Sequence, residues 1–180
     1  MCGIAGKLHW RPTLVNNPVT AMCERMAYRG PNDKGLINLE NIALGHQRLS
    51  ILDLSTKAKQ PMVSADGRYY IVYNGEVYNF QEIRNELKRC GYVFKSTSDT
   101  EVVLYSYSEW GVECLKKFKG MFSLAIWDAK RKEMFLARDR FGQKPLYFHI
   151  SNRKEITFAS ELTARRHLLL CKVIRQSLQF

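Results

Sequence analysis

The middle of the chain carries the clearest helical pattern of apolar and polar positions. Apolar side chains recur there at the spacing of one helical face, at Phe80, Ile83 and Leu87. Asn79 and Glu82 have the spacing of a capping box, and Gly91 is a typical residue to end the helix. A second helix is predicted from Asp99 to about residue 110, and an earlier one ends near residue 26. Two consecutive helices are therefore expected at the centre of the chain.

Strand-length apolar segments lie on both sides of these helices. They are predicted at 2–8, 42–52, 68–73, 121–128, 133–138, 146–150 and 156–159. The last four are expected to be consecutive antiparallel strands, because short charged or glycine-containing turns separate them. Residues 28–35 are rich in turn-forming side chains and predict a structured loop. This order favours an α+β fold, with two sheets or one large sheet covered by helices, over a parallel βαβ alternation.

Length and composition indicate one compact domain. A chain of 180 residues that is 46% hydrophobic can bury one substantial core. It lacks an apolar run of the ~18 residues that span a bilayer and a secretory signal pattern, so we expect a soluble, cytoplasmic protein with no membrane partner. The five cysteines, at positions 2, 23, 90, 114 and 171, form no C-x-x-C pair. Most are expected to be reduced, buried and inert, and no metal site is predicted.

The formal charge of +11 raises the question of a nucleic-acid surface. The 28 basic residues are spread along the chain among 17 acidic ones. The largest local excess lies near the C-terminus, at Arg165, Arg166, Lys172 and Arg175. No nucleic-acid-binding motif accompanies it. A solvated basic surface or a docking face is therefore favoured over a nucleic-acid partner.

The first residue that could carry chemistry is Cys2. Methionine aminopeptidase acts when the second residue is small, so removal of Met1 would leave Cys2 with a free α-amine beside its own thiol. An α-amine has a pKa of ~7.7–8.0, close enough to neutrality to act as general base for the thiol. A cysteine near an N-terminus is by itself more often a small buried residue, so other features must support catalysis.

Hydrolysis of a carboxamide by a thiol needs donors for an oxyanion and charges that hold the substrate. Asn74 and Gly75 offer a side-chain amide and an open backbone N–H at the end of a strand, although an Asn-Gly pair often makes an ordinary hairpin turn. Arg48 is a candidate for the α-carboxylate of glutamine, and Glu76 or Asp99 for its α-ammonium. A surface arginine, a strand-end glutamate and a helix-capping aspartate are the alternatives at these positions.

These residues lie in a series of motifs that resembles the glutaminase domain of the glutamine-hydrolysing asparagine synthetase family, which are class II glutamine amidotransferases. The matching motifs cover residues 1 to about 162 and are Met1-Cys2-Gly3-Ile4-Ala5-Gly6, Tyr28-Arg29-Gly30-Pro31, Gly45-His46-Gln47-Arg48-Leu49-Ser50-Ile51, Gln60-Pro61-Met62, Tyr73-Asn74-Gly75-Glu76-Val77-Tyr78-Asn79, Ser98-Asp99-Thr100-Glu101, Gly120-Met121-Phe122 and Ala137-Arg138-Asp139-Arg140-Phe141-Gly142. They follow the order of that family, so coincidence is not an adequate explanation.

The resemblance implies a four-layer αββα sandwich of the N-terminal nucleophile hydrolase type, with two mainly antiparallel sheets between helices. It implies that Cys2 is the nucleophile, its α-amine the proton acceptor, and Asn74 with the Gly75 N–H the oxyanion hole. The residues implied to bind glutamine are Arg48, Leu49, Ile51 and Leu52 on its carboxylate side and Glu76 and Asp99 on its ammonium side. The segments at Asp139 and at 144–147 also match, and are expected to position strands rather than to perform chemistry.

The implied reaction releases ammonia from glutamine through a γ-glutamyl thioester on Cys2 and then yields glutamate. The resemblance implies no cofactor or metal for this domain, and ATP and Mg²⁺ only for a synthetase domain. The implied boundaries are an amidotransferase domain at 1–162 and, at 163–180, the start of a linker toward that synthetase domain. The expected partners are L-glutamine and a synthetase domain or separate chain that accepts ammonia, with a homodimer as a further option.

Three hypotheses follow. The first is an active glutaminase. The second is a non-catalytic module that binds glutamine or docks on a partner, since an unprocessed Met1 would block the α-amine and crowd the thiol. The third is a nucleic-acid-binding protein that uses the positive charge, which the lack of a recognisable motif disfavours.

Overall fold

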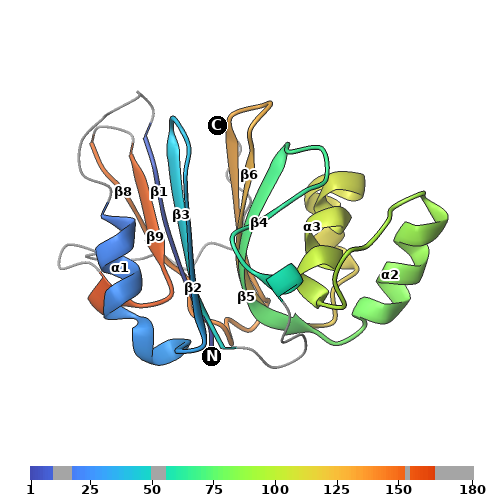
Figure 1. Ribbon diagram of the computed structural model, residues 1–180, viewed down its shortest axis with the longest axis horizontal. Helices are drawn as coiled ribbons and strands as arrows, with labels where there is room; N and C mark the ends of the chain where they lie inside the picture. The colour runs from blue at the N-terminus through green and yellow to red at the C-terminus, as the bar shows by residue number, and fades with distance from the viewer. Residues whose placement is uncertain (10–17, 50–55, 153–154, 165–180) are drawn as a thin grey trace.

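The computed structural model describes residues 1–9, 18–49, 56–152 and 155–164. Their strands form two antiparallel sheets that face each other, with helices on both outer sides (Figure 1). Across the molecule the order is α1, a five-stranded sheet, a four-stranded sheet, and the pair α2 and α3. The prediction of an α+β sandwich with helices outside two sheets is confirmed.

The five-stranded sheet places the N-terminal strand at its centre. Its order is β2 (Asp33–Asn38), β3 (Ile42–Arg48), β1 (Gly3–Leu8), β9 (Ile156–Ala159) and β8 (Tyr147–Ile150). Helix α1 (Val19–Arg25) covers its outer face with Val19, Met22 and Cys23. Because β1 is paired on both sides, by β3 and by β9, the residue before it is held close to a rigid part of the fold.

The four-stranded sheet carries the two helices that were predicted at the centre of the chain. Its order is β4 (Met62–Val63), β5 (Tyr69–Val77), β6 (Gly120–Asp128) and β7 (Glu133–Arg138). Helices α2 (Phe80–Arg89) and α3 (Asp99–Trp110) cover its outer face (Figure 1). Short 3-10 helices complete the described elements, at Ala27–Arg29, Thr56–Ala58, Gly111–Lys116 and Leu162–Ala164.

Two apolar layers hold the four-stranded sheet in place, and strand alternation assigns residues to them. Along β5, Ile71 and Tyr73 belong to the cluster under α2 and α3, whereas Val72 belongs to the cluster between the sheets. The layer between the sheets also contains the fully buried side chains of Ile4 and Phe158. Burial of each large apolar side chain stabilises the fold by about 1.5–3 kcal/mol, so these layers fix how the sheets face each other.

Three sequence predictions about strands were wrong in part. The loop expected at 28–35 ends in β2, because residues from Asp33 onward pair with β3. Strand β5 continues through Asn74 and Gly75 to Val77, so this Asn-Gly pair is not a hairpin turn. The last four strands are two separate pairs, since β6 pairs with β7 in one sheet and β8 with β9 in the other.

The capping box predicted for α2 is absent, although the helix begins after Asn79 as expected. The Asn79 side chain donates to the Lys117 carbonyl at 3.0 Å and accepts from the Lys119 N–H at 2.9 Å. These contacts compete with local capping and tie the start of α2 to the segment that leads into β6. A tertiary contact therefore replaces the local one.

The described residues contain free thiols in different environments. Cys23 and Cys114 are buried, as expected, whereas Cys90 is exposed. Cys171 and the basic residues at 165–175 lie outside the described ranges. None of the helices in these ranges is long and apolar enough to cross a membrane.

Candidate active site

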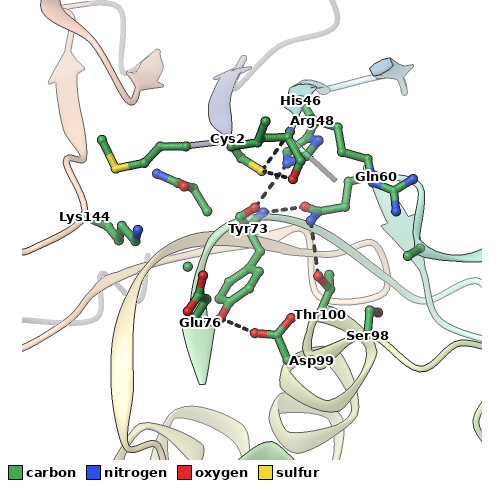
Figure 2. A pocket seen from close by; sticks show the side chains of 15 residues that line it. Cys2, His46, Arg48, Gln60, Tyr73, Glu76, Ser98, Asp99, Thr100 and Lys144 are labelled. Atoms are coloured by element: carbon green, nitrogen blue, oxygen red, sulfur yellow. Dashed lines mark hydrogen bonds between the residues drawn. The ribbon is translucent and has the colours of Figure 1, made fainter. Parts of the chain in front are cut away.

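A cavity of about 200 Å³ lies where β1 and β3 of one sheet approach β5 of the other. This volume is below the range of about 300–1,000 Å³ typical of drug-sized ligands, and suits a molecule as small as an amino acid. The cavity is lined by Met1, Cys2, His46, Arg48, Leu49, Ala58, Gln60, Tyr73, Asn74, Gly75, Glu76, Ser98, Asp99, Thr100 and Lys144. The structure thus gathers residues from distant segments around one small space (Figure 2).

Cys2 reaches this cavity from the end of the central strand. The Leu49 N–H donates to Cys2 Sγ at 3.3 Å, and Sγ lies 3.6 Å from the Leu49 carbonyl oxygen. The Arg29 Nε donates to the Cys2 carbonyl at 3.0 Å. The sulfur and the backbone of Cys2 are therefore both held.

Burial dominates the electrostatics of the Cys2 thiol. It raises the pKa of Cys2, while the Leu49 N–H, the positive N-terminus, Arg48 and Lys144 act to lower it. A thiol whose pKa is raised is mainly protonated at neutral pH and is a weak nucleophile without a base. Nucleophilic attack by this thiol would therefore require a group that takes its proton.

Met1 lines the same cavity and is 57% exposed. While Met1 is present, the α-amine belongs to Met1 and the nitrogen of Cys2 is an amide. An amide nitrogen does not accept a proton near neutral pH, whereas removal of Met1 would give Cys2 a free α-amine that can accept one.

Asn74 presents an unsatisfied donor to the cavity. Val72 lies between the sheets and Tyr73 under the helices, so strand alternation turns the Asn74 side chain toward the five-stranded sheet. The residue is 2% exposed, and its Nδ2 has no hydrogen-bond partner in the described parts of the chain. Such an orphan is costly, at about 1–3 kcal/mol, unless a ligand accepts its hydrogen bond.

The register of β5 and β6 orients the Gly75 N–H. Gly75 lies opposite Phe122, whose N–H and carbonyl both bond to Asp139, at 3.2 and 2.8 Å. Phe122 therefore turns its polar groups away from β5, and Gly75 forms a non-hydrogen-bonded pair whose N–H points away from β6. A Cβ at Gly75 would meet the Met121 carbonyl oxygen at 2.5 Å, so this close approach requires glycine.

The neighbouring amides on the same edge of β5 are occupied. The Tyr73 N–H donates to Gln60 Oε1 at 2.7 Å, and the Val77 N–H donates to Asp99 Oδ2 at 3.1 Å. The Gly75 N–H lies between them in the sequence and faces the same side, where Gly75 lines the cavity. Asn74 and Gly75 therefore offer two donors to one space, from inside a strand rather than from its end.

The acidic side of the cavity comes from α3 and β5. Asp99 is the first residue of α3, and the N-cap is Ser98. Asp99 is therefore not the helix-capping aspartate that the sequence left as an alternative. Asp99 Oδ2 accepts from the Tyr73 hydroxyl at 2.8 Å and from the Val77 N–H. Burial raises the pKa of the Asp99 carboxyl, although these hydrogen bonds act against it. Glu76 follows Gly75 on β5 and lines the same cavity (Figure 2).

Only some of the residues expected to bind the α-carboxylate of glutamine lie within the described ranges. Arg48 ends β3, is 8% exposed and lines the cavity, so it is not an ordinary surface arginine. Leu49 also lines the cavity, and its backbone contacts the Cys2 sulfur. Ile51 and Leu52 lie outside the described residues. Arg48 thus places a largely buried cation in the cavity that Cys2 also lines.

A chain of polar contacts that the sequence did not predict braces the cavity (Figure 2). His46 Nε2 lies 3.2 Å from the Tyr73 carbonyl, which links the two sheets. Gln60 accepts from the Tyr73 N–H and donates to Thr100 Oγ1 at 3.2 Å. The matching motifs contained these residues, but their alternating strand positions gave no signal that they share one wall.

Lys144 was expected from the sequence to have a structural role, and the structure also places it at the cavity. Its residue is 7% exposed and its side chain lines the cavity that holds Cys2. Asp139 has the expected positioning role, because its carboxylate binds backbone N–H groups of the following turn. No group of three or more His, Cys, Asp or Glu that could hold a metal ion occurs among the described residues.

The chain is similar to proteins of one family. A family model described as glutamine amidotransferase domain matches residues 1–178. Asparagine synthetase (glutamine-hydrolyzing) 3 of Bacillus subtilis (strain 168) is 39% identical over 168 residues, which are 91% of this chain and 27% of that protein. A putative asparagine synthetase (glutamine-hydrolyzing) 2 of Methanocaldococcus jannaschii is 38% identical over 180 residues, with 90% of this chain and 34% of that protein covered. The chain thus spans about a third or less of these relatives.

A solved structure supports the fold. Glutamine phosphoribosylpyrophosphate amidotransferase from B. subtilis, complexed with ADP and GMP, superimposes with a TM-score of 0.75 at 20% identity. The match covers 91% of this chain and 42% of that one. At this identity the similarity concerns the fold alone.

Proposed function

The chain belongs to the family of glutamine amidotransferase domains, and from this premise we propose that it hydrolyses the side-chain amide of L-glutamine through a thioester on Cys2. The observation that carries the proposal is that Cys2, Asn74 and Gly75 line one small cavity, in which Asn74 Nδ2 has no hydrogen-bond partner among the described residues. A nucleophile beside preorganised donors is the arrangement that acyl transfer requires.

Substrate binding uses the charges at two sides of the cavity. The α-carboxylate of glutamine pairs with Arg48, and its α-ammonium with Asp99 and Glu76. Asp99 is held by Tyr73 and Val77, so its carboxylate is oriented before glutamine arrives. Two oriented charges fix a free amino acid in one direction and place its side-chain amide toward Cys2.

The reaction begins when the Cys2 α-amine, freed by removal of Met1, takes the thiol proton. The sulfur then forms a bond to the amide carbon of glutamine, and the carbonyl electron pair moves onto oxygen. Asn74 Nδ2 and the Gly75 N–H donate to that oxygen. Removal of one such donor in other enzymes costs about 10²- to 10³-fold in rate, which indicates what each contributes.

Collapse of the tetrahedral intermediate breaks the carbon–nitrogen bond. The α-ammonium of Cys2 returns a proton to the leaving nitrogen, which departs as ammonia, and a γ-glutamyl thioester remains. Water then attacks the thioester with the α-amine as base, and glutamate leaves as the thiol is restored. The sum is glutamine and water to glutamate and ammonia, with no cofactor in this domain.

The ammonia acceptor is proposed from the relatives. Because the named relatives are asparagine synthetases, we propose that the chain supplies ammonia to an asparagine synthetase-like domain or partner, which would use ATP and Mg²⁺. The setting proposed for this activity is the cytoplasm. Residues 163–180 remain the proposed start of a linker toward that domain.

One observation favours a second candidate, a module that binds glutamine without turnover. Met1 lines the cavity, and a chain that keeps Met1 has no free α-amine at Cys2. Such a chain would retain Arg48, Glu76 and Asp99 for binding but lack the base. The state of the N-terminus therefore separates the two candidates.

The test is release of glutamate and ammonia from glutamine by protein whose N-terminal Cys2 has been verified by mass spectrometry. A matched Cys2→Ala variant and a Cys90→Ala variant serve as negative control and as control for an exposed thiol. Turnover that is lost only in Cys2→Ala supports the proposal. Absence of turnover in processed protein that binds glutamine by calorimetry rejects an autonomous glutaminase and favours the binding module.

A further inference from the structure

Lys144 places a second buried cation in the cavity. It lies in the segment between β7 and β8, where the chain passes from one sheet to the other. Figure 2 shows its side chain entering the cavity from the side opposite Gln60, with Cys2 and Glu76 also facing this space. The residue is 7% exposed, so its ammonium is not an ordinary solvated surface charge.

The Lys144 ammonium is not paired with a carboxylate among the described residues. Within the described ranges its Nζ makes no ion pair, while Asp99 Oδ2 is engaged by Tyr73 and Val77. In the proposed binding mode the α-carboxylate of glutamine pairs with Arg48 and the α-ammonium with the acidic side. A largely buried ammonium is costly unless negative charge lies near it, and Cys2 in the same cavity becomes negatively charged when its thiol loses its proton.

The backbone around Lys144 is fixed by its neighbours. The Asp139 carboxylate accepts from the N–H groups of Phe141, Gln143 and Lys144 at 3.1, 3.0 and 3.0 Å. Burial acts to raise the pKa of Asp139, but these hydrogen bonds outweigh it and hold the pKa below its ordinary value. Arg138 Nε donates to the Lys144 carbonyl at 2.5 Å. The turn is therefore braced on both sides, which limits where the lysine side chain can reach.

We propose that Lys144 supplies the positive charge that stabilises the Cys2 thiolate, when the thiol is deprotonated and again when the thioester is hydrolysed. Lys144 transfers no proton, because the α-amine takes and returns it. This inference rests on the proposed function and adds a residue to it. The charged and titratable groups that line the cavity together with Cys2 and Lys144 are the N-terminal amine, His46, Arg48, Tyr73, Glu76 and Asp99.

The test is the pH dependence of Cys2 alkylation by iodoacetamide in the processed full chain, followed on the N-terminal peptide by mass spectrometry. Lys144→Met is compared with Lys144→Arg and with Lys88→Met, which removes an exposed charge on α2. An opposite charge in the same largely buried site shifts the pKa of a titratable group by about one unit or more. We therefore expect the pH midpoint of Cys2 alkylation to rise by about one unit in Lys144→Met. It should stay near the wild-type value in Lys144→Arg and be unchanged in Lys88→Met.

Glutamine hydrolysis provides a second readout. Lys144→Met should lose about tenfold in kcat with little change in KM, because one pKa unit corresponds to tenfold in thiolate population. An unshifted alkylation midpoint in a variant with wild-type circular dichroism overturns the inference, whatever the hydrolysis rate. If Lys144→Met fails to fold, Lys144→Gln answers the same question with a polar side chain.

The measurements can reject the proposed glutaminase function and the role of Lys144 independently of each other. Alkylation needs no glutamine, so a shifted midpoint in a protein without glutaminase activity rejects the proposed function but keeps the charge effect. Normal hydrolysis in wild type with an unshifted midpoint in Lys144→Met rejects the role of Lys144 alone.

Discussion

His46 on β3 donates from Nε2 to the Tyr73 carbonyl on β5, across a distance of 3.2 Å that joins the two sheets beside the candidate nucleophile. A carbonyl oxygen only accepts, so Nε2 carries the ring proton in this contact. Burial lowers the pKa of His46 to about 4, and Nδ1 has no partner among the described residues. The ring is therefore neutral at pH 7 and holds Tyr73 in place without adding charge to the site.

This depressed pKa predicts a pH dependence of stability. An exposed histidine in the unfolded chain has a pKa of ~6.5, so between that value and about 4 the unfolded state binds the extra proton. The free energy of unfolding should therefore fall as pH decreases through this window, by up to about 3 kcal/mol. Urea denaturation at several pH values measures it.

Substitutions at two different histidines provide the test and the control for this prediction. His46→Gln should flatten the slope between pH 6.5 and 4, because glutamine can donate to Tyr73 but does not titrate. His149→Gln on β8, where the side chain is partly exposed, should leave the slope as in wild type. Equal slopes in wild type and His46→Gln would contradict the assignment.

Asn74→Ala should act on catalysis far more than on folding. Its Nδ2 makes no hydrogen bond within the described protein, so removal of the amide costs little stability. Loss of an oxyanion donor should lower kcat by about 10²- to 10³-fold while glutamine binding is retained. Steady-state kinetics and calorimetry separate the two effects, and Asn85→Ala on the exposed side of α2 is the matched control.

Gly75→Ala, unlike Asn74→Ala, should lower the stability of the fold. A Cβ at this position would lie 2.5 Å from the Met121 carbonyl oxygen, so β5 and β6 must move apart. Overpacking of this kind costs about 1–3 kcal/mol, and the shift also displaces the Gly75 N–H. Thermal unfolding should show a lower midpoint than Asn74→Ala, and a variant as stable as wild type would contradict the strand geometry.

Asp99 predicts how glutamine affinity depends on pH. Burial raises the pKa of its carboxyl, so protonation should occur at higher pH than in an ordinary aspartate. Because only the ionised form attracts the substrate ammonium, the affinity should fall as pH decreases through this raised pKa. Asp99→Asn should weaken glutamine binding about 10- to 100-fold at pH 7 and remove the pH dependence.

The matched control is Asp66→Asn, which changes an exposed carboxylate in a turn. Calorimetric titrations of glutamine from pH 7 downward compare the three proteins. The amide oxygen introduced by Asp99→Asn can still accept from the Tyr73 hydroxyl, so the fold should persist. An Asp99→Asn protein that binds glutamine with unchanged affinity would assign the ammonium side to Glu76 alone.

Removal of Met1 should switch the activity on. A form that carries an extra N-terminal residue resistant to cleavage should bind glutamine but release no ammonia, because Cys2 then has an amide nitrogen in place of an amine. Treatment of Met1-bearing protein with methionine aminopeptidase should restore turnover in proportion to the fraction of free Cys2. Intact-mass measurements alongside ammonia release check this relation, and turnover by the extended form would exclude the α-amine as base.

Local sequence patterns were sufficient for much of the architecture. The apolar spacing around Ile83 and Leu87 predicted α2, and Asp99 marked the start of α3. The motif order identified the family and the αββα layers. These features depend on residues within one helix turn or strand, or on a linear order of motifs, so no long-range contact is needed to see them.

The same sequence determined which chemical groups are available, since the thiol of Cys2, the amide of Asn74 and the charges of Arg48 and Asp99 are present in the chain whatever its fold. Only the tertiary structure decided their arrangement. The direction of the Gly75 N–H depends on its register with Phe122, and the entry of Lys144 into the cavity depends on a crossover between sheets. Register and crossover are set by packing between segments far apart in the sequence, and no local pattern encodes them.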